Sequence, residues 1–327
     1  MRTIGSILLM VLLATPLAFG QKVGTSSMQF LNVAPDARVS GLGTAYTAIA
    51  SGAHALYWNP AGLARTTGHS LALDRVDWLL DATHYSLAYG VSLARFGNLG
   101  VHFYLADMGD FQETRVDQLG FVERDGVQVY NPGLTGQSFS LQSWVVGLSY
   151  ARNFTDRFAA GLTVKMARED LWLASTSVLL FDFGMTYETG FRSLRLGASV
   201  KNFGASVSFA EEEYPVPLLF RIGAAVDVVG ESGLVLPSGV SRVTATFDLI
   251  QPNDYDQQWA AGLEYAFLQK FLVRAGYQHN FDVASYSAGL GFRQGVGSLE
   301  LGLDYSYSDM SEFLGAVHRL GLSFLIE

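Results

Sequence analysis

Residues 299–307 read Leu-Glu-Leu-Gly-Leu-Asp-Tyr-Ser-Tyr, an alternation of large apolar residues with small, polar or acidic ones. Because successive side chains of a strand point to opposite faces, this stretch predicts a strand with one apolar face and one small, polar face. The same period of two recurs from about His69 to Ile326, in segments of roughly nine to thirteen residues. It is clearest in residues 85–94, 218–228, 242–249, 259–267 and 320–326.

The length of these segments separates a membrane barrel from a soluble β protein. A soluble sandwich also alternates, but it joins many shorter strands by tight turns, and a propeller would show a repeat of roughly forty residues, which is not visible. In lipid every backbone group must be paired internally, so a sheet with an apolar outside has to close. The sequence therefore predicts an all-β fold, a transmembrane antiparallel β-barrel of about fourteen strands over residues 67–327.

The connections between the predicted strands alternate in length. Those after even-numbered strands are mostly short, and those after odd-numbered strands are more often long, notably 109–137, 203–217, 251–256 and 309–315. Outer-membrane barrels combine short periplasmic turns with longer external loops. This parity predicts that both chain termini lie in the periplasm.

The first twenty residues have the features of a secretory signal peptide. A basic start at Arg2 precedes an apolar stretch from Ile4 to Ala14 and the small-residue site Ala18-Phe19-Gly20. The apolar stretch is too short to span a bilayer as a helix. We therefore expect residues 1–20 to be a cleaved signal peptide that exports the chain to the bacterial outer membrane.

Composition and residue types exclude several kinds of chemistry. The chain has no cysteine, which excludes disulfides, thiolate catalysis and iron–sulfur clusters. The net charge of −9 argues against a nucleic-acid partner. The six histidines are not spaced for a metal site, and no catalytic series of nucleophile, base and acid can be assembled. We expect no enzyme activity and no cofactor.

The segment ahead of the first strand, residues 21–66, has its own character. Residues 37–48 read Ala-Arg-Val-Ser-Gly-Leu-Gly-Thr-Ala-Tyr-Thr-Ala and predict a short helix that includes Gly41, Gly43 and Ala45. A turn follows at Asn59-Pro60-Ala61-Gly62, where Pro60 fixes φ and Gly62 can take a positive φ. This turn either shapes the segment only or takes part in gating or ligand contact.

The stretch from Arg38 to Ala64 resembles the start of the PorV/PorQ family, which is similar in turn to the FadL-type long-chain fatty-acid channels. Both share a Gly-x-Gly-x-Ala helix, here Gly41, Gly43 and Ala45, and an Asn-Pro-Ala-Gly turn, here residues 59–62. The resemblance implies a fourteen-stranded barrel with residues 21–66 folded into the lumen as a plug. A barrel of intermediate size needs such partial plugging to avoid leakage.

The resemblance to PorV and PorQ implies a component or cargo-handling partner of type IX protein secretion. Its partners would then be outer-membrane lipid and secretion-system proteins or cargo C-terminal domains. The longest predicted loop, 109–137, would be the docking surface, with Tyr130, Asn131, Pro132 and Gly133 as its candidate residues.

The alternative reading is a FadL-like passive channel for hydrophobic small molecules such as long-chain fatty acids. Glycines on the predicted lumen face would leave room for a ligand, or they would only permit close packing and curvature of the sheet. These glycines are Gly90, Gly197, Gly223, Gly262, Gly289 and Gly302.

Overall fold

The computed structural model describes residues 25–326 except 210–211, 282–284 and 312–313. The predicted signal peptide, residues 1–20, and the first residues of the predicted plug lie outside this part of the chain and stay predictions. Within it, no helix is long and apolar enough to cross a membrane.

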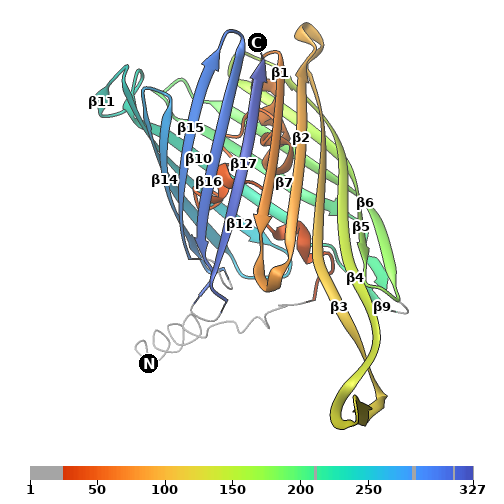
Figure 1. Ribbon diagram of the computed structural model, residues 1–327. Helices are drawn as coiled ribbons and strands as arrows, with labels where there is room; N and C mark the ends of the chain where they lie inside the picture. Colours follow the sequence, from red (N-terminus) through yellow and green to blue (C-terminus); the bar gives the residue numbers. More distant parts are fainter. Residues whose placement is uncertain (1–24, 210–211, 282–284, 312–313, 327) are drawn as a thin grey trace, which may run out of the picture.

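Fourteen long strands form one closed antiparallel barrel, as the alternating pattern predicted (Figure 1). Each strand pairs with its neighbours along the chain, and closure comes from the pairing of β1 with β17 and of β7 with β10. The barrel strands are β1 (His69–Asp77), β2 (Thr83–Ser92), β3 (Asn98–Arg124), β4 (Val127–Asn153), β5 (Phe158–Asp170), β6 (Ser175–Glu188), β7 (Arg195–Gly204), β10 (Leu219–Gly230), β12 (Ser241–Pro252), β13 (Gln258–Phe267), β14 (Phe271–His279), β15 (Tyr286–Val296), β16 (Leu299–Asp309) and β17 (Ala316–Ile326).

Short elements accompany the fourteen long strands. β8 (Val207–Phe209) and β9 (Glu212–Tyr214) form a small separate hairpin, and β11 (Leu236–Pro237) adds two parallel residues to β10. Two single-turn helices, η3 (Leu79–Asp81) and η4 (Ala94–Phe96), lie in connections between strands.

The alternation sorts residues between the outside and the lumen. On β16, Leu301, Leu303 and Tyr305 are exposed on the outer face, whereas Asp304 and Ser306 are buried toward the lumen. Lipid can cover the apolar outer residues, while the polar inner ones need partners inside the barrel.

The two ends of the barrel differ. The turn end carries the β2–β3, β4–β5, β13–β14 and β15–β16 connections, and β17 ends there, since Ile326 pairs with His69. The loop end carries the β1–β2, β3–β4 and β7–β10 connections. The first described residues lie at the loop end, where the Ser27 amide donates to the Pro215 carbonyl over 3.0 Å. The prediction that both termini lie at the same end is therefore wrong for the described chain, because the plug runs through the lumen before β1 begins.

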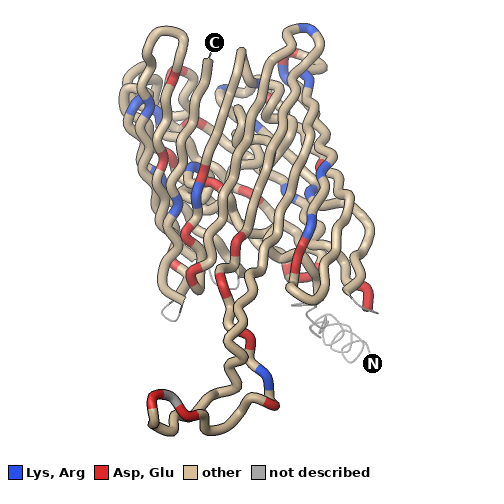
Figure 2. The backbone as a smooth tube through the Cα atoms, turned by 45° about the vertical axis from the view of Figure 1, so that its right-hand side comes forward, with Lys and Arg blue, Asp and Glu red and all other residues tan. Residues whose placement is uncertain are grey.

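The longest predicted loop is a β-ribbon instead. β3 and β4 continue past the barrel at the loop end and form a two-stranded extension over residues 109–137 (Figure 1). Its tip is Asp125-Gly126, both with positive φ, a sequence typical of a tight hairpin turn. Residues 110–125 contain more acidic than basic residues, and Figure 2 shows red segments predominating there.

Candidate functional site

The plug fills the middle of the lumen with four short helical pieces. They are η1 (Gln29–Asn32), α2 (Ala37–Ser40), α3 (Ala55–Trp58) and η2 (Pro60–Arg65). α2 packs against β15, β16 and β17, whereas η2 packs against β3, β4, β5 and β6 on the opposite side of the closed sheet. The plug thus bridges the lumen from wall to wall.

The predicted plug helix is shorter than expected. Asp36 caps α2 by accepting from the Val39 amide over 2.8 Å, but the helix ends at Ser40. Gly43 and Thr44 both have positive φ; Gly41 and Gly43 follow the helix in a turn, and Ala45 comes directly after that turn. The helix does not continue because the chain after it is bound by the barrel wall instead. A carboxylate oxygen of Asp248 on β12 accepts from the Tyr46 and Thr47 amides and the Thr47 hydroxyl.

The predicted turn at residues 59–62 is present and buried. The Asn59 side chain accepts from the Ala61 amide over 3.2 Å and donates to the Thr47 and Met185 carbonyls over 2.8 and 3.1 Å. Pro60 begins η2, a position that needs no amide donor. Gly62 does not take a positive φ; it lets the chain approach Ala50, whose carbonyl oxygen would lie 2.3 Å from an added Cβ.

Lumen glycines mark where the plug backbone touches the wall. A Cβ on Gly197 would lie 2.4 Å from the Thr47 carbonyl oxygen, and one on Gly276 would lie 2.0 Å from the Gly43 nitrogen. Glycines 161, 184, 223, 262 and 289 meet the plug in the same way, and Gly90 meets the Leu63 side chain. Gly302 instead faces Ser323 and Arg293 on the wall. Close packing, not space for a ligand, explains most of the predicted glycines.

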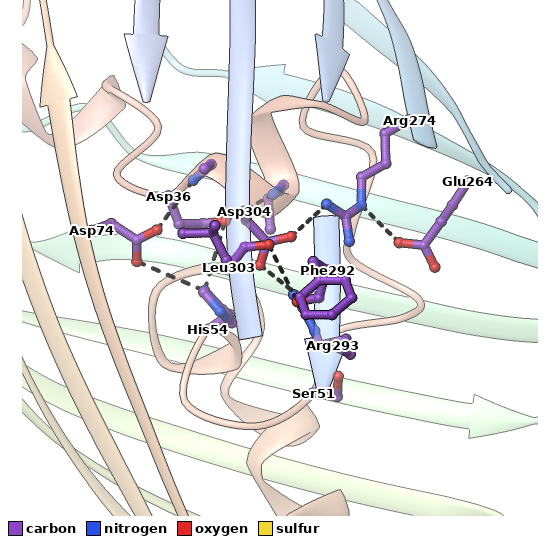
Figure 3. Close-up of polar contacts among 12 residues, drawn as sticks. Asp36, Ser51, His54, Asp74, Glu264, Arg274, Phe292, Arg293, Leu303 and Asp304 are labelled. Atoms are coloured by element: carbon purple, nitrogen blue, oxygen red, sulfur yellow. Dashed lines mark hydrogen bonds and ion pairs between the residues drawn. The ribbon is translucent and has the colours of Figure 1, made fainter. Parts of the chain in front are cut away.

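A belt of buried and half-buried charges runs along the inner face of the barrel wall beside α2 (Figure 3). Arg274 donates to Glu264 over 2.8 Å and to Asp304 over 2.7 Å, and Arg293 donates to the other oxygen of Asp304 over 2.6 Å. Buried carboxylates and guanidinium groups are tolerable only when paired in this way. The belt links the inner faces of the four adjacent strands β13, β14, β15 and β16.

One histidine of the plug sits between two carboxylates. His54 Nδ1 lies 3.8 Å from an oxygen of Asp36 and 4.0 Å from an oxygen of Asp74 on β1, too far for hydrogen bonds (Figure 3). Burial lowers the pKa of His54, which keeps the imidazole neutral at physiological pH. The Asp74 carboxylate instead accepts a hydrogen bond from the Ala37 amide over 3.2 Å.

A cavity of about 450 Å³ lies between the plug and the wall toward the loop end. This volume falls within the range of small-molecule pockets, and the lining mixes aromatic and aliphatic side chains with a few polar groups. Its lining residues are Gln29, Asn32, Val33, Ala34, Ser40, Thr44 and Trp58 of the plug and Trp78, Leu219, Arg221, Ile250, Pro252, Asp254, Tyr255, Gln258, Gln278, Phe281, Ser308, Met310 and Arg319 of the barrel and its connections.

Two arginines on the wall hold the plug beside this cavity. Arg221 donates to the Thr44 carbonyl over 2.9 Å, and its guanidinium lies 5.1 Å from the Trp58 ring centre. Arg319 donates to the Ala34 carbonyl over 3.1 Å and to the Ser308 hydroxyl over 2.9 Å. We call the cavity of about 450 Å³ between the plug and the wall the plug cavity.

The plug cavity and its lining residues Arg221, Arg319 and Trp78 were not predicted from the sequence. The cavity joins residues from both ends of the chain, and no local pattern carries that pairing. Of the predicted site residues, Asn59 to Gly62 and Gly41 to Ala45 lie in the plug, whereas Tyr130 to Gly133 lie on the β-ribbon. Within the described ranges, no group of three His, Asp or Glu residues could hold a metal ion.

The candidate docking residues shape a bulge in the β-ribbon. The Asn131 side chain accepts from the Leu134 amide over 2.8 Å, and Gly133 has a φ of 97° beside the Arg115 carbonyl. Their role in docking stays a prediction.

Comparison with known proteins identifies solved structures that share this fold. No protein-family model and no curated protein sequence matches the chain. Among solved structures, the toluene transporter TbuX of Ralstonia pickettii has a TM-score of 0.60 at 12% identity, covering 89% of this chain and 98% of TbuX. The toluene transporter TodX of Pseudomonas putida has a TM-score of 0.58 at 12% identity, covering 88% and 97%.

A FadL homologue of Pseudomonas aeruginosa has a TM-score of 0.54 at 10% identity, covering 89% of this chain and 98% of its own. At these identities the likeness establishes the fold. The comparisons give no support for the PorV/PorQ assignment or for type IX secretion. The chain has the plugged-barrel fold of FadL-type outer-membrane transporters.

Proposed function

We propose that this chain is a passive outer-membrane channel for hydrophobic small molecules, with the plug cavity as its binding site. The observation that carries the proposal is a cavity of about 450 Å³, with mixed aromatic and polar lining, at the loop end of a plugged barrel. The fold relatives, two toluene transporters and a FadL homologue, support this reading. In the outer membrane the loop end would face outward, so the cavity would receive molecules from outside.

The proposal is tested by uptake in a bacterial host that lacks its own channels for hydrophobic compounds. We expect expression of the chain to raise the uptake rate of labelled toluene or of a labelled long-chain fatty acid. Gln258→Trp places a large ring in the cavity from β13, whereas Tyr265→Trp changes the exposed outer face of the same strand.

The first variant should lower uptake, and the second should leave it unchanged at equal amounts of folded barrel. Uptake equal to that of the empty host, with folded barrel in the outer membrane, would rule the channel out.

A further inference from the structure

The β-ribbon has two unlike strands, one charged and one uncharged. Residues 110–124 on β3 carry four acidic and two basic residues, whereas residues 127–141 on β4 carry no charge at all. Proteins commonly place charged residues on free sheet edges, where they prevent a further strand from pairing. The β3 edge of the β-ribbon has this protection, and the β4 edge lacks it.

Both edges of the β-ribbon are open. β2 pairs with β3 only as far as Asp107, and β5 pairs with β4 only from Gln142 onward, so among the described residues no third strand lies beside the β-ribbon. The backbone groups along these edges are therefore free to pair with another strand. Pro132 and the bulge at Gly133 interrupt the β4 edge, which leaves residues 127–131 as its regular outer part.

The outer part of the β-ribbon also exposes apolar side chains on both faces. By the register of β3 with β4, Phe121 and Tyr130 share one face, and Val122 and Val129 share the other. All four are exposed, from 37% for Val122 to 70% for Phe121. A ribbon of two strands is marginal in water, and three or more strands are needed for independent stability. Exposed apolar surface of this kind is typical of an interaction site.

The turn determines which backbone groups the open edge offers. Asp125-Gly126 is a two-residue turn with positive φ at both positions. The residues that flank such a turn are hydrogen-bonded to each other, and the direction of the backbone groups then alternates along each strand. The amides and carbonyls of Gln128 and Tyr130 consequently point away from β3, to the open edge.

We propose that the open β4 edge, residues 127–131, pairs with the same edge of a second copy of this chain. In an antiparallel arrangement with a two-fold axis at Val129, Gln128 of each copy pairs with Tyr130 of the other. The two Val129 side chains then lie side by side, and the two β-ribbons form one continuous sheet of four strands. This contact lies outside the barrel and does not depend on the proposed channel function.

The distribution of charge favours a second copy as the occupant. Pairing between identical edges brings like residues close together, which is unfavourable wherever those residues are charged. The β4 edge meets this condition, because residues 127–131 are uncharged. The charged β3 strands become the outer edges of the sheet, about 14 Å apart and beyond the Debye length of about 8 Å. A foreign strand would find no charge on the β4 edge to recognise.

A single introduced thiol tests the contact, because the chain has no cysteine. Opposite residues of a non-hydrogen-bonded antiparallel pair have Cα atoms about 4.5 Å apart, within disulfide range. Purified Val129→Cys barrel in detergent should therefore give a disulfide-linked dimer on oxidation with copper phenanthroline. Val122→Cys is the matched control, because Val122 pairs with Val129 within the β-ribbon and is similarly exposed, but lies on β3. It should give no linked dimer.

Charged substitutions test whether the partner is a second copy. Val129→Lys and Val129→Glu should each lose the dimer in sedimentation velocity, because like charges would face each other across the axis. An equal mixture of the two variants should regain it, because opposite charges then meet. Heat-modifiable migration confirms that the barrel of each variant is folded.

Three results would overturn the inference: a monomer as the only species of the unchanged protein, equal yields of linked dimer for the two cysteine variants, or dimers that persist in both charged variants. A fourth is a link in isolated outer membranes from Val129→Cys to a different protein in place of a second copy. That link would assign the β4 edge to a foreign strand.

Discussion

Asn59 is the residue on which the plug turn depends. Its side chain is fully buried and satisfies one donor and two acceptors of the backbone, including Met185 on the wall. In Asn59→Ala these three groups lose their partner, and each buried unsatisfied group costs about 1–3 kcal/mol. We expect faster hydrogen exchange of the amides in residues 47–62, measured by mass spectrometry, with an intact barrel.

Asn32→Ala is the matched control for this variant, because the Asn32 side chain is exposed and donates to Gln29. It should leave the exchange of residues 47–62 unchanged. Equal protection in both variants would show that the Asn59 hydrogen bonds do not anchor the plug.

The turn at residues 59–62 could be predicted from the sequence, whereas the surroundings of His54 could not. Asn59 and Pro60 were predicted to form a turn, because an asparagine side chain can hydrogen-bond to nearby backbone and proline fixes φ. His54 gave no such signal, since its carboxylate neighbours Asp36 and Asp74 come from separate segments. Local stereochemistry is readable from a short stretch, whereas a buried cluster depends on how distant segments meet.

The β-ribbon is the element that departs most from the sequence prediction. Its residues 109–137 were expected to form a loop, as the longest connection between the predicted strands. In the structure β3 and β4 instead remain paired there, with register shifts after Asp107, Gln112 and Thr114. The Asp125-Gly126 turn was the local signal for a hairpin.

Because the β-ribbon extends beyond the barrel, the barrel should not depend on it. Replacing residues 110–139 by Asn-Gly keeps the regular β3–β4 pairing from Asn98 to Asp107. We expect unchanged heat-modifiable migration and a melting temperature within about 2 °C of the full chain. Circular dichroism during heating measures the latter.

The opposite outcome, a barrel that no longer folds, would show that the β-ribbon helps β3 and β4 to pair. The same variant tests the docking prediction for Tyr130 to Gly133. A partner that binds through these residues should be recovered from native membranes with the full chain and not with the shortened one.

At the scale of the whole molecule, the sequence predicted the wall better than its contents. Closure and strand number followed from alternation and from the need to pair every backbone group in lipid. The path of the plug did not follow, and the start of the described chain at the loop end contradicts the loop-parity prediction. The alternation of short and long connections locates only the ends of the barrel strands. It therefore cannot predict where a segment that passes through the lumen begins.

The seal between plug and wall gives the last prediction. Gly262 and Gly276 pair across β13 and β14, and both lie directly beneath residues 42 and 43 of the plug. In Gly276→Ala the added Cβ would lie 2.0 Å from the Gly43 nitrogen, a contact that backbone cannot accept. Neither the closed sheet nor the plug turn can yield by a side-chain rotation, so the plug must shift away from the wall.

A shifted plug should open a path for ions through a barrel that its own side chains do not fill. We expect a larger single-channel conductance for Gly276→Ala than for the unchanged protein in planar bilayers. Gly295→Ala, where an added Cβ meets nothing within 4 Å, should conduct like the unchanged protein. If both variants conduct alike, then the plug tolerates displacement at this contact and the seal lies elsewhere along the lumen.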